Sequence, residues 1–480
     1  MVSPLSSSTS SPIVPGTAIP GNAAPENAIS ENAISENAVA QSPHRSLATA
    51  YGQVRQLSEQ ICQPLMVEDY GVQTMPDVSP PKWHLAHTTW FFETFLLIPH
   101  LPNYQVFHSQ FGYLFNSYYE AVGQRHPRPQ RGLLSRPTVA EVYRYRAYVD
   151  QAMRSLLQHT AGDPAIATLI TLGLHHEQQH QELLFTDLKH ILATNPLRPA
   201  YRPELVELWQ GGSSTAPALS ATPAAETWLD YPGGLYAIGY ETPTGNGSSD
   251  TSTLDTFALD TFAFDNESPR HSVYLQDFWL GARLVTNGEY LEFINAGGYR
   301  QPEHWLSEGW ATVQREQWEA PLYWEAIDGQ WWVMTLGGML PVAEHEPVCH
   351  VSFFEADAFA RWAGKRLPTE GEWEVAAAAV PCQGNLLASG RLHPAPAQGM
   401  TRPDQLYGDV WEWTQSPYSP YPGFKTAAGA IGEYNGKFMC NQMVLRGGSC
   451  VTPPGHIRPT YRNFFPPSTR WQFSGIRLAM

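Results

Sequence analysis

Four long amphipathic segments in the first 200 residues are the strongest constraint on the fold. Their apolar residues recur at the three- and four-residue spacing of a helix. Pro80-Pro81 opens the second segment, and a Thr138-x-x-Glu141 capping box opens the third. Because each helix has an apolar face to bury, we expect the four to pack as a bundle. The predicted helices span residues 46–62, 80–97, 138–160 and 163–192.

The sequence changes character after about residue 226. Short aromatic and β-branched runs alternate there with glycine, proline and asparagine, and only residues 354–366 and 370–379 predict helices. This pattern indicates an irregular, β-rich α+β domain with long loops. The low-complexity N-terminus predicts a disordered tail over residues 1–46. After it we expect a four-helix domain over 47–200, a linker over 201–225 and the β-rich domain over 226–480.

Composition restricts the partners and the compartment. The chain has 29 Lys and Arg against 45 Asp and Glu, a formal net charge of −16, which argues against binding to nucleic acid or to an anionic membrane. Its five cysteines are scattered and form no C-x-x-C pair, as in proteins of a reducing compartment. We see no signal-peptide pattern and no apolar run of the roughly 18–20 residues that cross a bilayer. We therefore expect a soluble cytoplasmic protein.

The fourth segment carries a candidate metal site. His176 and His180 lie four residues apart, so both imidazoles can reach one ion. The same residues match the H-E-x-x-H helix of zinc proteases, with Glu177 as the general base. However, the Gly and His that follow this motif in metzincins are missing, and the nearest downstream acids, Glu204 and Glu207, lie in proline-rich sequence. This argues against a protease and leaves Glu177 as an ordinary helix residue.

A third ligand is available on the second segment. The motif K-W-H-L-A-H holds His84 and His87, and spacing alone does not distinguish between them. Three histidines from two helices form a site with open positions, which suits catalytic Zn²⁺ or non-haem Fe²⁺. Glu182 lies about 200° around the helix from His180, so we expect it outside the coordination sphere.

Several motifs together resemble the sulfoxide synthases of ergothioneine biosynthesis, also called hercynine oxygenases. They are WHLAHTTWFFE, HHEQQHQE, RLPTEGEWEVAA, GDVWEWT, LRGGS and RPTYRNFF. The resemblance covers nearly everything after about residue 47. It implies a DinB-like four-helix bundle joined to a domain with the C-type-lectin-like fold of formylglycine-generating enzymes. The catalytic cysteine pair of those enzymes is not matched, so formylglycine generation is not implied.

The resemblance also implies a metal and a reaction. Fe(II) would be held by His87, His176 and His180, which selects His87 over His84. The enzyme would use O₂ to join the sulfur of a thiol donor to C2 of the imidazole of hercynine and would form the sulfoxide in the same turnover. Hercynine is a trimethylammonium compound, for which aromatic faces are natural partners.

Two departures from the members that use γ-glutamylcysteine favour free cysteine as the donor. Phe465 replaces an acidic residue, and Ile431 replaces a catalytic tyrosine. The branch that uses free cysteine instead has tyrosines in the loop after the second helix, matched here by Tyr118 and Tyr119. We predict these two as the catalytic residues.

The resemblance finally implies a set of substrate contacts. An Arg-x-x-Arg pair in the same loop would hold the carboxylate of the donor, although Arg125 leaves its register open. The predicted substrate-binding residues are Arg128, Arg131, Gln179, Tyr434, Asn463, Phe464 and Phe465. Alternatives are the same chemistry with γ-glutamylcysteine or a selenosugar, a different regiochemistry on histidine, and a non-catalytic DinB-like protein that binds metal and thiols.

Overall fold

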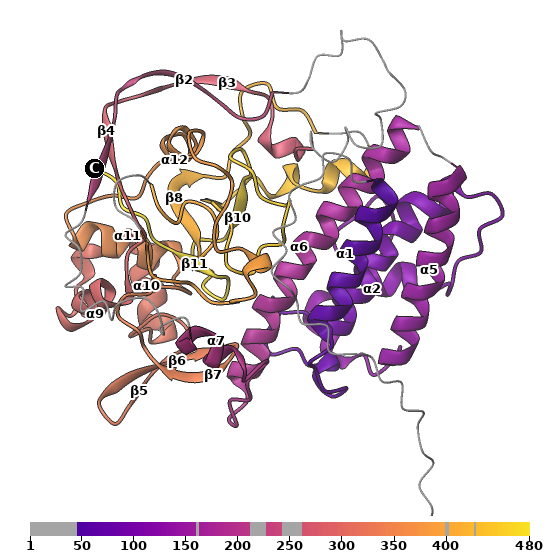
Figure 1. Cartoon of the computed structure of the whole chain (residues 1–480), viewed down its shortest axis with the longest axis horizontal. Helices are drawn as coiled ribbons and strands as arrows, with labels where there is room; N and C mark the ends of the chain where they lie inside the picture. The colour runs from indigo at the N-terminus through magenta and orange to yellow at the C-terminus, as the bar shows by residue number, and fades with distance from the viewer. Residues whose placement is uncertain (1–45, 160–162, 212–226, 242–261, 399–402, 427–428) are drawn as a thin grey trace, which may run out of the picture. The chain divides into compact units, whose positions relative to one another are not determined.

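Four long helices pack side by side in the N-terminal part of the chain, as predicted (Figure 1). The computed structural model describes residues 46–159, 163–211, 227–241, 262–398, 403–426 and 429–480. The long helices are α1 (Leu47–Cys62), α2 (Pro81–Phe92), α5 (Val139–His159) and α6 (Pro164–Thr194). Helix α6 packs against both α1 and α2, while α2 also packs against α5. The predicted bundle is confirmed. Of the N-terminal tail predicted over residues 1–46, residues 1–45 lie outside the described residues.

Local sequence explains where these helices begin. Ser46 caps α1 by accepting a hydrogen bond from the Thr49 amide at 3.3 Å. The capping box before α5 forms as expected, with the Glu141 carboxylate accepting from the Thr138 amide at 2.8 Å. Asp163 caps α6 and Pro164 occupies its first position, which starts a helix of 31 residues.

The second predicted helix is less regular than its sequence suggests. Helix α2 passes into a π-helix at Glu93–Leu97 and then into the short α3 (Ile98–His100). The connection to α5 contains α4 (Phe111–Phe115) and a 3₁₀ turn at Arg128–Leu133. This connection carries the predicted tyrosines and arginines.

The C-terminal region is a mixture of small sheets and helices, which confirms the predicted α+β class. Its sheets have the strand orders β1-β4, β2-β3, β5-β6-β7 and β10-β9-β8-β11. All pairs are antiparallel except β8 and β11. The strands are β1 (Trp228–Tyr231), β2 (Gly234–Ile238), β3 (His271–Leu275), β4 (Phe278–Gly281), β5 (Trp324–Ile327), β6 (Gln330–Thr335), β7 (Gly338–Pro341), β8 (Trp411–Pro417), β9 (Met443–Arg446), β10 (Asn463–Phe465) and β11 (Ser474–Gly475).

The prediction of only two helices in this region is wrong. Helices α11 (Phe353–Trp362) and α12 (Glu370–Ala377) form as expected, but α9 (Asn287–Asn295) and α10 (Ser307–Glu316) form as well. A capping box between Thr286 and Glu289 starts α9.

The segment predicted as a linker, residues 201–225, starts with a packed helix. This helix is α7 (Leu205–Gly211), and the side chain of its first residue, Leu205, is buried. The indole of Trp209 donates to the Arg391 carbonyl at 2.9 Å, which ties this helix to the C-terminal region. Residues 212–225 lie outside the described part of the chain.

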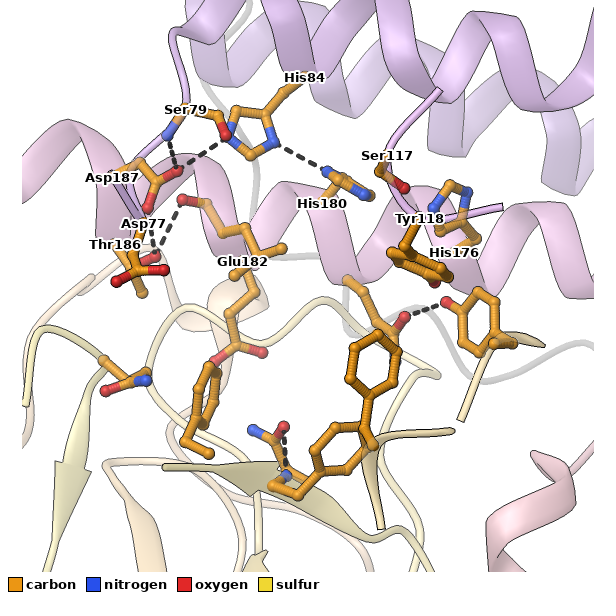
Figure 2. A pocket seen from close by; sticks show the side chains of 18 of the residues that line it. Asp77, Ser79, His84, Ser117, Tyr118, His176, His180, Glu182, Thr186 and Asp187 are labelled. Atoms are coloured by element: carbon orange, nitrogen blue, oxygen red, sulfur yellow. Dashed lines mark hydrogen bonds and ion pairs between the residues drawn. The ribbon is translucent and has the colours of Figure 1, made fainter. Parts of the chain in front are cut away.

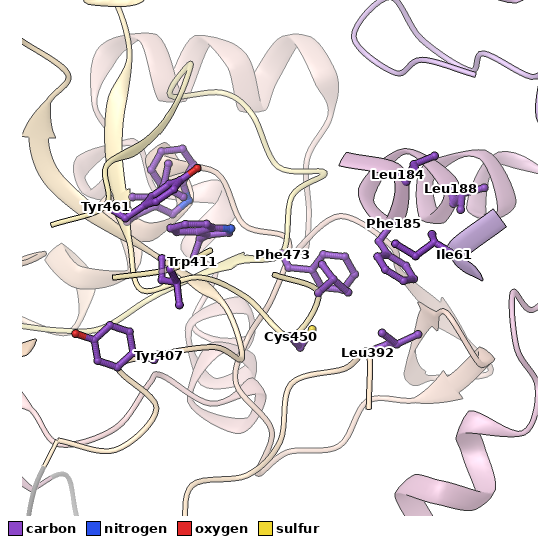
Figure 3. Packing of buried hydrophobic residues seen from close by; sticks show 14 of the residues in the cluster. Ile61, Leu184, Phe185, Leu188, Leu392, Tyr407, Trp411, Cys450, Tyr461 and Phe473 are labelled. Carbon is purple, nitrogen blue, oxygen red and sulfur yellow. The ribbon is translucent and has the colours of Figure 1, made fainter. Parts of the chain in front are cut away.

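The hydrophobic core runs without interruption from the bundle into the C-terminal region. Leu184, Phe185 and Leu188 of α6 belong to the same buried cluster as Trp411 and Phe473 (Figure 3). Helix α6 therefore packs against the bundle on one side and against the C-terminal region on the other. Its polar residues lie between the same two regions. Among the described helices, none combines the length and the apolar character that a membrane crossing requires.

Candidate metal centre

Three imidazoles converge where α2 lies against α6. His87 comes from α2, and His176 and His180 come from adjacent turns of α6. One nitrogen from each ring lies within 4.8 Å of the other two. The Nε2 atoms of His87 and His176 are 3.2 Å apart. This spacing suits three ligands around one cation.

Burial keeps these rings in the form that binds metal. It lowers the pKa of His176 to about 3, and it holds the pKa values of His87 and His180 well below the ordinary range. The imidazoles are therefore neutral at physiological pH, and each has one nitrogen lone pair. The His87 Nδ1 donates to the Phe115 carbonyl at 2.6 Å, which leaves its Nε2 lone pair directed to the triad. The residues present thus fit a borderline divalent metal such as iron or zinc.

His84, the other candidate from the K-W-H-L-A-H motif, lies outside the triad. Its Nδ1 is 2.8 Å from His180 Nδ1, and its Nε2 is 2.9 Å from Asp187 Oδ2. Both ring nitrogens are therefore engaged. The structure groups His87, and not His84, with the two histidines of α6.

Glu177 faces the interior of the bundle and not the triad. Its carboxylate accepts from Arg55 Nη1 at 2.8 Å, from Arg146 Nη2 at 3.0 Å and from Ser58 Oγ at 2.6 Å. All four side chains are buried. The expectation of an ordinary helix residue is wrong, because Glu177 is the centre of a buried ion-pair cluster. This position also denies it the role of general base in a protease.

A cavity of about 360 Å³ opens beside the triad (Figure 2). Its walls come from α6, from α2 and the segments on either side of it, and from the C-terminal region. Most of the predicted site residues line it, whereas His87 and Tyr119 do not. The predicted residues in its walls are Tyr118, Arg128, Arg131, His176, Gln179, His180, Tyr434, Asn463, Phe464 and Phe465.

Gln179 is held by two tyrosines of the C-terminal region. Its amide nitrogen donates to the Tyr461 hydroxyl at 2.8 Å, and its carbonyl oxygen accepts from the Tyr434 hydroxyl. The Tyr434 ring stacks on Phe264 with centroids 5.4 Å apart and lies 5.7 Å from the His176 ring. An aromatic wall therefore stands close to the triad.

The two predicted catalytic tyrosines stack on each other, with ring centroids 4.7 Å apart. Tyr118 lines the cavity, whereas Tyr119 is fully buried and its hydroxyl has no hydrogen-bond partner among the described residues. Burial raises the pKa of both hydroxyls above the ordinary range, so both keep their protons. Lys437 donates to the Tyr118 carbonyl, and Glu433 accepts from the amides of residues 120 and 121, which fixes this loop.

The arginines of the loop differ in environment. Arg128 is half-exposed and lies 3.6 Å from Asp77, and Arg125 is similarly exposed. Arg131 is buried, and its guanidinium lies 3.3 Å above the Trp83 ring. It donates to Ser79 Oγ at 2.9 Å, no ion pair joins it to a described residue, and burial lowers its pKa. Arg131 is thus a buried guanidinium in the cavity wall that Asp187 stabilises through space, without forming an ion pair with a described residue.

Several residues of the cavity were not predicted. Glu182 lines it and accepts from Trp411 Nε1 at 2.7 Å, Ser449 Oγ at 2.5 Å and Thr452 Oγ1 at 2.9 Å. It joins α6 to the C-terminal region and stays outside the triad, as expected. Asp187 could have been found in the sequence, since it lies two helical turns after His180 on the same face. No spacing signal marks Phe264, Tyr461 or Gln472, which also lie in the walls.

Comparison with known proteins identifies both parts of the chain. Residues 50–184 match the DinB superfamily, and residues 224–400 and 403–480 match the sulfatase-modifying factor enzyme 1-like domain. Hercynine oxygenase of Mycolicibacterium smegmatis is 33% identical over 439 residues, which cover 85% of this chain and 92% of that protein. The hercynine oxygenase of Mycolicibacterium thermoresistibile is 32% identical over 434 residues, covering 84% and 88%. That of Mycobacterium tuberculosis is 40% identical over 238 residues, covering 45% and 55%. The chain belongs to the hercynine oxygenase family, in which a DinB-like bundle is joined to a sulfatase-modifying-factor-like domain.

Proposed function

We propose that this protein is an Fe(II)-dependent enzyme that uses O₂ to join the sulfur of cysteine to C2 of hercynine, giving hercynylcysteine S-oxide. The observation that carries the proposal is the histidine triad beside a cavity with an aromatic wall and a buried arginine that forms no ion pair with a described residue. The names of the relatives support hercynine as the substrate. The domain limits of residues 47–200 and 226–480 are part of the same proposal.

The metal would be held by His87, His176 and His180 through their neutral imidazoles. When bound, iron would supply the activation of O₂ and would lower the pKa of the coordinated thiol. His87 and His176 are buried and His180 is half-buried, which limits the access of bulk water to the metal side of the cavity.

Hercynine would bind along the aromatic wall. Its trimethylammonium group has no hydrogen to donate, so the faces of Phe264 and Tyr434 are suitable partners. Gln179 lies one residue before His180, and its two tyrosine partners fix the orientation of its amide next to the triad. Asn463 Oδ1 accepts from the Phe464 amide at 2.9 Å, which leaves the Asn463 amide nitrogen to donate to the substrate carboxylate.

The sulfur donor would bind through Arg131. A guanidinium matches a carboxylate with two parallel hydrogen bonds, and the charge of Arg131 has no carboxylate partner among the described residues. Arg128 would assist from its exposed position. Phe465, where γ-glutamylcysteine-using members have an acid, supports the smaller donor, because it offers no negative charge to the ammonium group of a γ-glutamyl part.

Tyr118 is the proposed proton donor of the reaction. It lines the cavity next to His176, and burial keeps its hydroxyl protonated. It can hydrogen-bond or protonate an oxygen that becomes negatively charged during the reaction. Tyr119 would orient Tyr118 through the stacked rings.

The test is an O₂-uptake assay on protein that is loaded anaerobically with Fe(II). Hercynine is added with cysteine, γ-glutamylcysteine or a selenosugar, and the products are identified by mass spectrometry. We expect O₂ uptake and the S-oxide with cysteine, and neither with a His176→Ala control. Faster turnover with another donor would contradict the assignment of cysteine. Absence of uptake with every donor would instead indicate a non-catalytic protein that binds metal and thiols.

A further inference from the structure

We propose that His84 and Asp187 are positioning residues that place the proton of His180 on Nδ1 and thereby strengthen the metal site. The inference rests on the metal centre of the proposed function but not on its substrates. His84 and Asp187 are both buried, and neither belongs to the triad. Figure 2 shows Asp187, His84 and His180 in a row, joined by hydrogen bonds.

The direction of this chain of hydrogen bonds follows from Asp187. Its Oδ2 accepts from the Ser79 amide at 2.8 Å, so this oxygen is an acceptor. The same oxygen lies 2.9 Å from His84 Nε2, which must therefore carry the hydrogen. In an imidazole that carries a single N–H on Nε2, Nδ1 has the lone pair, and this is the form of His84 on which the inference rests.

The orientation of His84 in turn determines that of His180. His84 Nδ1 lies 2.8 Å from His180 Nδ1. Because the first nitrogen can only accept, the second must donate. His180 then has its lone pair on Nε2, the nitrogen that remains for the metal. The reverse order would place the lone pair of His84 Nε2 against the carboxylate at 2.9 Å, which is unfavourable.

His87 provides an internal comparison. Its Nδ1 donates to the Phe115 carbonyl, which gives the same proton order and leaves Nε2 for the metal. A peptide carbonyl cannot be removed by substitution. At His180 the equivalent acceptor is the side chain of His84, which Asp187 orients in turn. Both can be substituted, so the contribution of proton placement to metal binding can be measured here.

The experiment is an anaerobic titration of the full-length protein with Co(II), a spectroscopic probe, in competition with a chelator. We expect His84→Phe and Asp187→Ala to weaken Co(II) binding by roughly 10- to 100-fold, the usual effect of losing such a partner. Asp187→Asn should restore most of the affinity, because an amide oxygen can accept from both Ser79 and His84. Because asparagine also keeps the Ser79 bond, His84→Phe, which leaves that bond in place, is the variant that isolates proton placement from a structural role of Asp187.

Two controls separate proton placement from misfolding. His190→Phe removes another histidine of α6, which is 2.6 Å from Thr74 and outside the triad, and should leave Co(II) affinity unchanged. The thermal midpoints of the metal-free variants should lie close to that of the wild type. Affinities of His84→Phe and Asp187→Ala within about twofold of the wild type would overturn the inference.

The outcome is distinguishable from failure of the proposed function. Weakened Co(II) binding in the two variants would support the inference even if no donor led to O₂ uptake. A wild-type protein that binds no Co(II) and no Fe(II) would overturn both proposals. O₂ uptake with hercynine, together with unchanged Co(II) affinity in the variants, would overturn the inference alone.

Discussion

Glu177→Gln tests the ion-pair cluster inside the bundle. The substitution keeps the size of the side chain but removes the negative charge between Arg55 and Arg146. Arg55 retains Asp150 at 2.8 Å, whereas Arg146 is left with Glu59, a partly exposed carboxylate at 3.3 Å. Removing one partner of a buried pair typically costs about 3–5 kcal/mol, because the remaining charge stays desolvated. We expect a loss of this size in the free energy of unfolding.

Urea denaturation of the metal-free protein, followed by circular dichroism, measures this loss. Glu59→Gln is the matched control, since it removes a carboxylate from the same Arg146 at the protein surface and should cost less than about 1 kcal/mol. Replacing Glu177 and Arg146 together with leucine and methionine should cost less than Glu177→Gln alone, because no uncompensated charge remains next to Arg55 and Asp150.

Acid should reveal the same cluster. Burial alone would raise the pKa of Glu177, but the charges of Arg55 and Arg146 outweigh it and hold the pKa below the usual range. The stabilisation from ionised Glu177 is present above the unfolded pKa of about 4.3 and is lost as the pH falls through the lower folded pKa. Glu177→Gln should flatten the stability curve in that acidic window. Equal stability of Glu177→Gln and Glu59→Gln, or loss of Co(II) affinity in a stable Glu177→Gln protein, would refute the reasoning.

Three further predictions concern the cavity and its surroundings. Arg131→Gln should raise KM for cysteine by roughly 10- to 100-fold, the equivalent of one lost charged hydrogen bond, and leave KM for hercynine unchanged in O₂-uptake kinetics. Phe465→Asp should shift the ratio of kcat/KM from cysteine towards γ-glutamylcysteine, and an unchanged ratio would contradict the role given to this residue. Burial lowers the pKa of Lys189 to about 8, so the wild type should gain up to roughly 3 kcal/mol of stability over Lys189→Met between about pH 8 and 10.4 in urea denaturation. A constant difference between the two proteins would show that Lys189 does not titrate in this range.

The helices of the bundle could be predicted because their signals are local. Periodicity and the capping residues before α5 and α6 lie within a few positions of each helix start. Helix α9 carries the same kind of signal, the Thr286 and Glu289 capping box, but its short aromatic sequence resembles a strand. The π-helix at Glu93–Leu97 has no comparable mark in the sequence.

The metal centre was predictable only in part for a similar reason. The four-residue spacing of His176 and His180 is a property of one helix, whereas the choice between His84 and His87 depends on which nitrogen faces α6. Glu177 was misjudged because its partner Arg55 lies 122 residues away. Contacts between residues so far apart depend on how the helices pack, and they produce no periodic pattern in the sequence.

The cavity has walls from both the bundle and the C-terminal region, and this division affects how its substrate specificity can evolve. The triad belongs wholly to the bundle, whereas Tyr434, Asn463 and Phe465 come from loops and an edge strand of the other region. Mutations in those loops can therefore alter which small molecule is accepted while the ligand set stays intact. An engineer seeking new donors would diversify the segments around Tyr434 and Asn463 and leave α2 and α6 untouched. Separating the two regions at the level of the gene would remove the far wall of the cavity and expose the side chains of α6 that now pack against the C-terminal region.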